Sequence, residues 1–154
     1  LYVAKWYRLT VQRCKVITNF KCTIYHFNGV GYSKFYVPHC HWQENKASNV
    51  MKSGLQNADS VTVYIPLDSL VITPSSSLLL ANDVFPGMKI VPKKPSQDLI
   101  VKGYCDFEFN NTDPKTVSES MKEFNKSFSY NTIMTIDIKD YGAKRLQHIK
   151  ISGK

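Results

Sequence analysis

The chain has 154 residues, of which 43% are hydrophobic and 12% aromatic, and its formal net charge is +8. This composition is typical of a globular protein, and the length suits one domain with a single hydrophobic core. No apolar run is long enough to span a bilayer, so we expect a soluble protein with no membrane partner.

Half of the net charge lies in the first fifteen residues, which contain four basic residues and no acidic one. Leu1 is what a TTG start codon gives when it is translated literally, and Val16 suits a GTG start. One interpretation is that residues 1–15 are an upstream extension that the native protein lacks, and the other is a genuine basic arm. The segment has neither the apolar core nor the cleavage site of a secretory signal. We expect residues 16–154 to form the single domain.

The cysteines are widely spaced and include no CxxC pair. They are Cys14, Cys22, Cys40 and Cys105. All lie in apolar or alternating segments, a pattern that predicts buried, reduced thiols in a cytoplasmic setting and no disulfide framework.

The first predicted structural unit is a β-hairpin. Residues 19–27 are rich in aromatic and β-branched side chains, and the glycines that follow them suit a turn. The return strand covers residues 34–42, where simple alternation places Val37 and Cys40 on opposite faces. Because Pro38 cannot donate a ladder hydrogen bond, this strand lies at an edge or contains a bulge.

The return strand contains three functional side chains in a row, His39, Cys40 and His41. In an extended strand the two histidines share a face while the cysteine points the other way, so the three cannot converge on one ion. A zinc site would need further ligands, and no HExxH or CxxC motif supplies them. We therefore favour a structural strand here over a metal site or a Cys/His nucleophile.

A polar segment and a strand come next. Residues 43–59 are polar and loop-like, with Val50, Met51 and Leu55 expected to tether them to the core. Residues 60–66 alternate apolar and polar side chains before a proline, which predicts a half-buried strand.

Residues 67–98 are predicted to form a long loop, because they contain a run of serines, several prolines and the pair Lys93-Lys94. A connection of this length in a small domain is usually functional or disordered. Its apolar pieces, 78–80 and 84–85, favour docking against another surface, for which a neighbouring subunit is the candidate.

A strand and the only clear helix follow this loop. Residues 98–109 resume the sheet, with Gly103 at a bulge or tight bend. Thr112 or Asp113 can cap the helix and Pro114 suits its first turn. Its apolar face repeats at helical spacing and consists of Val117, Met121, Phe124 and Phe128.

A final hairpin closes the chain, with strands over residues 132–139 and 145–151 and a turn at 140–142. Together these elements predict a mainly β fold. We expect a small antiparallel β-barrel or sandwich with one α-helix packed against it.

Motifs for catalysis or cofactor binding are missing from the sequence, which has no GxxxxGK loop, no GxGxxG turn and no GxSxG elbow. Asp106 and Glu108 share a face of a predicted strand, which is the minimum for paired-carboxylate chemistry, but a solvated or ion-paired edge is the favoured interpretation. We therefore expect no catalytic residue, no metal and no cofactor.

A barrel with aromatic residues on its early strands could instead stack single-stranded bases, as OB-folds do. The residues concerned are Tyr25, Phe27, Tyr36 and Trp42. Aromatic side chains at strand spacing are more often core than stacking platforms, and the lysines are scattered along the chain. Single-stranded nucleic-acid binding is the alternative function, and a metal-dependent enzyme built on His39 and His41 is a more distant one.

Several segments of the chain have distinctive sequences and a distinctive order: PHCHW, VTVYIP, DLIVKGYCDFEFNN, a short helix, and IDIKDYGAKRLQHIKISGK. In these segments the chain resembles a family of small phage-encoded proteins of unknown function. The resemblance spans residues 18–154, and its most specific parts are IVKG and YGAKRLQHIKISGK. The proline-rich connection over residues 72–97 departs from the pattern. No catalytic or ligand residue is carried over.

That family occurs in tailed phages and prophages of Gram-positive bacteria, among the genes for head completion and head–tail joining. By fold-level analogy with neck proteins, which are small β-barrels assembled as rings, the resemblance implies a structural virion protein of the head–tail connector. Its partners would be portal-proximal connector, tail-completion or capsid proteins, with packaged double-stranded DNA close by, after synthesis in the host cytoplasm. We predict a partner-facing or DNA-facing surface at Lys93, Lys94 and Lys102.

Overall fold

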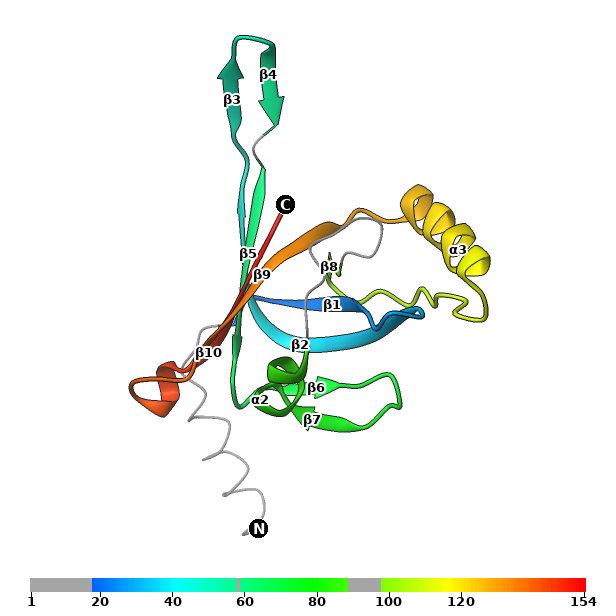
Figure 1. The fold of residues 1–154 in the computed structure, drawn as a ribbon. Helices are drawn as coiled ribbons and strands as arrows, with labels where there is room; N and C mark the ends of the chain where they lie inside the picture. The colour runs from blue at the N-terminus through cyan, green and yellow to red at the C-terminus, as the bar shows by residue number, and fades with distance from the viewer. Residues whose placement is uncertain (1–17, 58, 89–97) are drawn as a thin grey trace.

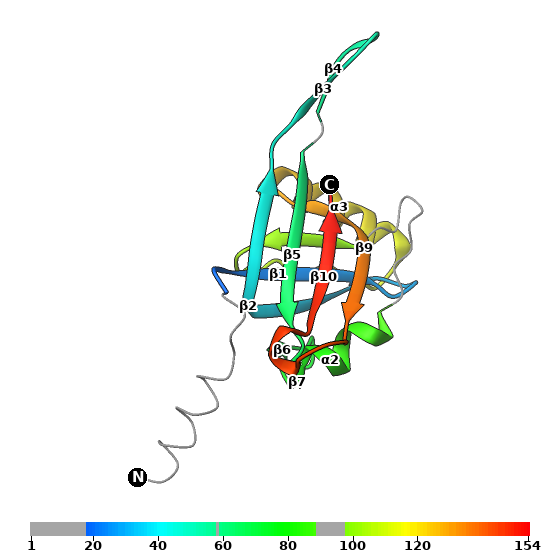
Figure 2. The same cartoon turned by 90° about the vertical axis from the view of Figure 1, so that its left-hand side faces the viewer.

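The computed structural model describes residues 18–57, 59–88 and 98–154, and its main feature is a closed barrel of antiparallel strands (Figures 1 and 2). The barrel strands are β1 (Phe20–Phe27), β2 (Tyr32–Asn45), β5 (Ser60–Pro66), β8 (Leu99–Lys102), β9 (Asn131–Lys139) and β10 (His148–Gly153). Around the barrel they run in the order β1-β8-β9-β10-β5-β2, and the pairing of β2 with β1 closes it. The predicted mainly β fold, a small barrel with a helix packed against it, is confirmed.

The other elements lie outside the barrel wall. They are the hairpin of β3 (Ser48–Met51) and β4 (Gly54–Asn57), the hairpin of β6 (Leu70–Ile72) and β7 (Leu78–Leu80), the short helices α2 (Ala81–Val84) and η1 (Phe85–Gly87), the helix α3 (Pro114–Ser127), and η2 (Lys144–Leu146). Helix α3 covers one side of the barrel, while the two hairpins extend from its opposite ends (Figures 1 and 2).

Strand β2 turns the corner between the two halves of the barrel. Its first half pairs with β1 and its second half with β5. The register shifts between these halves, since Cys22 pairs with Val37 while Phe20 pairs with Cys40. The extra residue makes a bulge next to Pro38, which confirms one of the two predicted outcomes for that proline. The bulge reverses the side-chain alternation, so Val37 and Cys40 are both in the core and their prediction to opposite faces is wrong.

Two separate cores meet at β1. The first fills the barrel and includes Cys22 and Ile24, whereas the second lies between the barrel and α3 and includes Tyr25. Strand β8 divides in the same way, with Ile100 in the barrel and Leu99 in the second core. Because successive residues of a strand point to opposite faces, both strands are covered on both sides.

The second core is strongly aromatic. Phe124 of α3 is fully buried at its centre, and its ring lies 5.2 to 5.4 Å, centroid to centroid, from several aromatic neighbours. The predicted apolar face of the helix is confirmed, and Asp113 is its N-cap, forming a capping box with Thr116. Within the described parts of the chain, no helix has the length and apolar character needed to cross a membrane.

The strand predicted over residues 98–109 is shorter than expected. Strand β8 ends at Lys102, and Gly103 turns the chain with a φ of +86°, a conformation that glycine adopts without strain. Residues 103–112, called the strap below, then cross the outside of β1 without regular pairing on their way to α3 (Figure 1). The aromatic residues of the strap pack into the second core, and this packing replaces strand pairing.

The predictions of a polar loop over residues 43–59 and of a long loop over residues 67–98 are also wrong in part. The first range contains the end of β2 and the β3–β4 hairpin. The second contains β6, β7, α2 and η1 in its described part. Ala81, Val84 and Phe85 are buried in the barrel core, so this segment docks on its own domain and the prediction that 84–85 meets a neighbouring subunit is wrong.

We expect Phe124→Ala to lower the free energy of unfolding by about 3–5 kcal/mol, because truncating a fully buried aromatic side chain leaves a cavity. Tyr141→Ala, at an exposed position of the β9–β10 connection, is the control and should change it little. Urea denaturation of both variants measures the difference. Equal losses in the two variants would contradict a role for the second core in holding α3.

Candidate assembly surfaces

The β3–β4 hairpin forms an arm, defined here as residues 46–59, that continues β2 and β5 beyond the end of the barrel (Figure 1). The two strands pair from Ser48–Asn57 to Met51–Gly54, so only two residues form the turn. Gly54 has a φ of +118°, which suits glycine at this tight turn. At the base, the Ala47 N–H donates to the Asp59 carboxylate over 3.1 Å.

The arm is an exposed two-stranded ribbon. Among the described residues, β3 and β4 form a sheet of their own and pair with no barrel strand. Val50 is 84% exposed, so the prediction that it tethers this segment to the core is wrong. Isolated two-stranded hairpins are marginally stable in water. The arm therefore has the character of an element that a partner stabilises.

A second exposed apolar element lies at the opposite end of the barrel (Figure 1). Strand β6 extends the sheet from β2 through the pair Tyr36–Ile72, and β7 pairs with β6 as the outermost strand described. Leu78, Leu79 and Leu80 are 60%, 43% and 42% exposed, respectively. We call this row the β7 edge. Buried Phe85, shortly after it in the chain, anchors the hairpin to the barrel.

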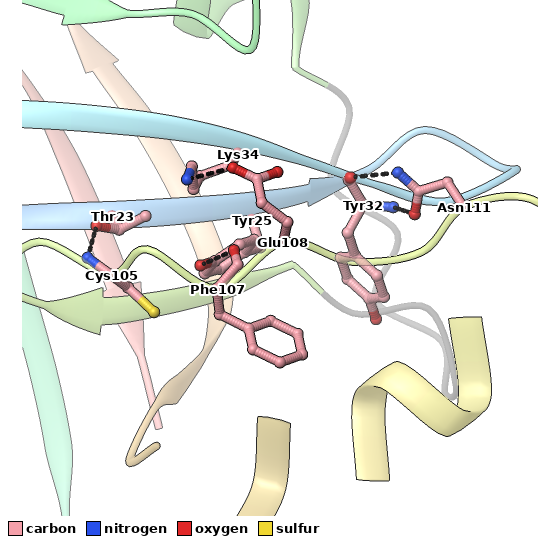
Figure 3. Close-up of polar contacts among 8 residues, drawn as sticks. All are labelled: Thr23, Tyr25, Tyr32, Lys34, Cys105, Phe107, Glu108 and Asn111. Atoms are coloured by element: carbon pink, nitrogen blue, oxygen red, sulfur yellow. Dashed lines mark hydrogen bonds and ion pairs between the residues drawn. The ribbon is translucent and has the colours of Figure 1, made fainter. Parts of the chain in front are cut away.

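A groove of about 420 Å³ separates the β6–β7 hairpin from the strap. Tyr36 and Tyr104 form part of its lining and meet edge to face, with ring centroids 5.0 Å apart. Lys34 also lines it, and its ammonium lies 2.5 Å from the Glu108 carboxylate (Figure 3). The same ammonium lies 5.7 Å from the centre of the Tyr104 ring. Glu108 is therefore an ion-paired residue, as the favoured sequence interpretation expects.

The strap wall of this groove is fastened to the barrel by hydrogen bonds (Figure 3). Asn111 accepts from the Tyr32 N–H over 3.0 Å and donates to the Tyr32 carbonyl over 2.9 Å. The Tyr25 hydroxyl donates to the Phe107 carbonyl over 2.9 Å, and burial raises the pKa of Tyr25, which keeps this donor protonated. A Cβ at Gly31 would lie 2.3 Å from the Asn111 side-chain oxygen, so glycine is required for this close approach.

Only one of the three predicted surface lysines lies within the described residues. Lys93 and Lys94 lie outside them. Lys102 ends β8, with its ammonium 3.2 Å from the Glu44 carboxylate and 4.3 Å from the centre of the Phe20 ring. The pKa of Glu44 is lowered mainly by a hydrogen bond from the Trp42 side chain and, to a smaller extent, by the one from Lys102. Lys102 thus contacts a carboxylate of its own chain.

The three consecutive residues His39, Cys40 and His41 lie in different surroundings. His39 is exposed, His41 is half-buried beside the Tyr64 ring at 6.0 Å, and Cys40 lies inside the barrel. No group of three or more histidine, cysteine or acidic side chains that could hold a metal occurs in the part of the chain that the structure describes. Cys22, Cys40 and Cys105 are buried, as predicted, while Cys14 lies outside the described residues.

The aromatic platform of the alternative prediction does not form as one surface. Tyr25 is buried in the second core and Trp42 in the barrel, so neither ring can stack on a base. Phe27 is half-buried against the second core, and Tyr36 lines the groove.

Sequence reasoning missed the arm and the strap. The signal for the arm was the short tract Lys52-Ser53-Gly54, which suits a tight turn between two strands of equal length. The strap gave a misleading signal, because Phe107 and Phe109 alternate with acidic residues as they would in a strand.

We expect Asn111→Ala to lower the free energy of unfolding by about 1–3 kcal/mol, because it leaves two backbone groups of Tyr32 without their partner. Asn125→Ala, on the exposed side of α3, removes the same side chain elsewhere and should cost little. Chemical denaturation gives the stabilities, and amide hydrogen exchange at Tyr32 should become faster only in Asn111→Ala. Unchanged exchange there would show that Asn111 does not hold the strap.

Comparison with known proteins places the chain in one family. No curated protein and no solved structure matches it. A family of unknown function, DUF6751, matches residues 17–154, a range that includes the whole barrel, the arm, the β6–β7 hairpin and α3. The protein is therefore a member of the DUF6751 family of unknown function.

Proposed function

We propose that this protein is a structural virion protein of a tailed phage or prophage, and that it works in the head–tail connector by assembling into a ring. It acts by forming contacts with other copies and with connector, tail-completion or capsid proteins, and not by catalysis. The observation that carries the proposal is the arm, a two-stranded ribbon that stands clear of the barrel with Val50 exposed at 84%.

The arm supports an assembly role for a physical reason. Ordering each residue of a ribbon costs conformational entropy, and two strands with little burial recover only part of it. A partner that covers the apolar side chains and the free strand edges supplies the remaining stabilising free energy. The β7 edge offers a second uncovered surface, so one copy has two places where another can attach.

The phage context rests on the resemblance of the IVKG block and the C-terminal ending. A ring around a DNA channel also suits the charge of the chain, whose net value of +8 is modest for a protein beside a polyanion. Each lysine–phosphate contact adds salt-dependent affinity that would slow the passage of DNA. Lys102 already contacts Glu44, so it would meet DNA only weakly. Lys93 and Lys94, outside the described residues, are the other two lysines proposed to contact DNA or a partner.

We expect the purified protein to form a discrete oligomer, or a stoichiometric complex with the portal-proximal proteins encoded beside its gene. Replacing residues 46–59 with Asn-Gly should abolish this assembly and leave the barrel folded. The design is matched to the structure, because Asn45 and Ser60 are cross-strand partners and a two-residue turn can join them. Light scattering measures the mass, and thermal unfolding checks the fold.

Point variants provide the controls for this experiment. Val50→Lys should weaken assembly, whereas Leu146→Lys, at an exposed apolar position of η2, should not. A wild-type protein that stays monomeric alone and with those partners would overturn the proposal. Oligonucleotide binding by such a monomer would favour the alternative of single-stranded nucleic-acid binding.

A further inference from the structure

We infer that the arm of one copy pairs with the β7 edge of a neighbouring copy, adding its strands to that sheet. The occupant of the edge is a second copy of this chain. This inference rests on the proposed self-assembly and names the two surfaces that meet.

The hydrogen bonds of the β6–β7 hairpin show which backbone groups are available. The Ala81 N–H donates to the Ser69 carbonyl over 2.8 Å, and the Thr73 N–H donates to the Ser77 carbonyl over 2.9 Å. Bonded and non-bonded pairs alternate along an antiparallel ladder. Leu78 and Leu80 are therefore in the non-bonded pairs, so the N–H and C=O of Leu78 and the N–H of Leu80 point away from β6, toward the open edge. Leu80 is also the N-cap of α2, and its C=O belongs to that helix.

Among the described residues, this edge lacks the usual protection against strand addition. Edge strands are commonly blocked by charged residues, proline or bulges. β7 consists of three leucines, and its pairing with β6 is regular from Leu70–Leu80 to Ile72–Leu78. An edge of this kind is a template for another strand, and β3 and β4 of the arm have the length to occupy it.

Charge and apolar surface are complementary between the two elements. Residues 67–88 contain Asp68 and Asp83 and no lysine or arginine, a net charge of −2. Residues 46–59 contain Lys46, Lys52 and Asp59, a net charge of +1. The exposed Val50 of the arm offers an apolar contact to the leucines of the edge.

The positions of the two elements determine the kind of assembly. The arm and the β6–β7 hairpin lie at opposite ends of the barrel in both views (Figures 1 and 2), so they cannot pair within one copy. Pairing between copies is head to tail and uses two different surfaces. Such a contact forms a ring when the rotation between copies closes, as the proposed function requires.

A proline substitution tests the backbone pairing directly. Leu80 has a φ of −74°, which proline adopts without strain, and its N–H faces the open edge and not β6. We expect Leu80→Pro to abolish assembly while the thermal unfolding of the monomer is unchanged. Leu80→Ala is the matched control, because it shortens the side chain but keeps the N–H, and it should retain assembly.

Cross-linking between differently tagged copies tests the contact itself. In a Cys14→Ser background the remaining native cysteines are buried, so introduced thiols react selectively. A short bis-maleimide should join a Val50→Cys copy to a Leu79→Cys copy. It should not join Val50→Cys to Leu146→Cys, which is exposed in η2. The next residue, Gln147, accepts a hydrogen bond from the Leu67 N–H, just before the β6–β7 hairpin, so this control lies on the same side of the molecule as the β7 edge.

The outcomes separate the two proposals. If the wild type assembles but Leu80→Pro assembles equally well, or the Leu79 cross-link is no stronger than the Leu146 one, the arm does not pair with the β7 edge, and the proposed function stands. A wild type that never assembles overturns both.

Discussion

The burial of β1 on both faces is the constraint on which the rest of the structure depends. Cys22 and Ile24 complete the barrel interior, while Thr23 and Tyr25 face outward, where a barrel strand would normally meet water. The outward face must be covered because an exposed aromatic and β-branched surface would cost free energy. The strap and α3 supply this cover, and Thr23 itself accepts a hydrogen bond from the Cys105 N–H at 3.0 Å.

Burial of side chains in the barrel also explains why the two hairpins extend in fixed directions. The arm continues β2 and β5, so its direction is set by strands whose inward-facing residues are buried in the barrel. The β6–β7 hairpin is anchored by the residues that follow it, because Ala81, Val84 and Phe85 are buried in the barrel core. Both exposed elements are thus attached to rigid parts, and a neighbouring copy would meet them already positioned.

Elements that bury one regular face could be predicted from the sequence. β5 alternates Val61, Val63 and Ile65 inward, and α3 repeats its apolar residues at helical spacing behind an Asp113 cap, so both were predicted closely. The strap could not be predicted, because a coil whose aromatic residues pack beneath a helix has the same spacing as a strand. The β2 bulge was foreseen from Pro38, but its effect on Val37 and Cys40 depends on the partner register, which one strand cannot reveal.

The arm escaped prediction for a related reason, whereas residues 78–80 were expected to dock against another surface. Periodic patterns in a sequence reflect burial within one chain. A strand that only a second copy covers has no such pattern, because it packs against no core of its own chain. The arm therefore reads as a polar loop with isolated apolar residues such as Val50. The β7 edge reads as the run Leu78–Leu80, with apolar side chains on both faces, although no face of it is buried in the single copy. An apolar run without alternation is typical of a strand covered on both sides. In this protein the missing cover is what a neighbouring copy would provide.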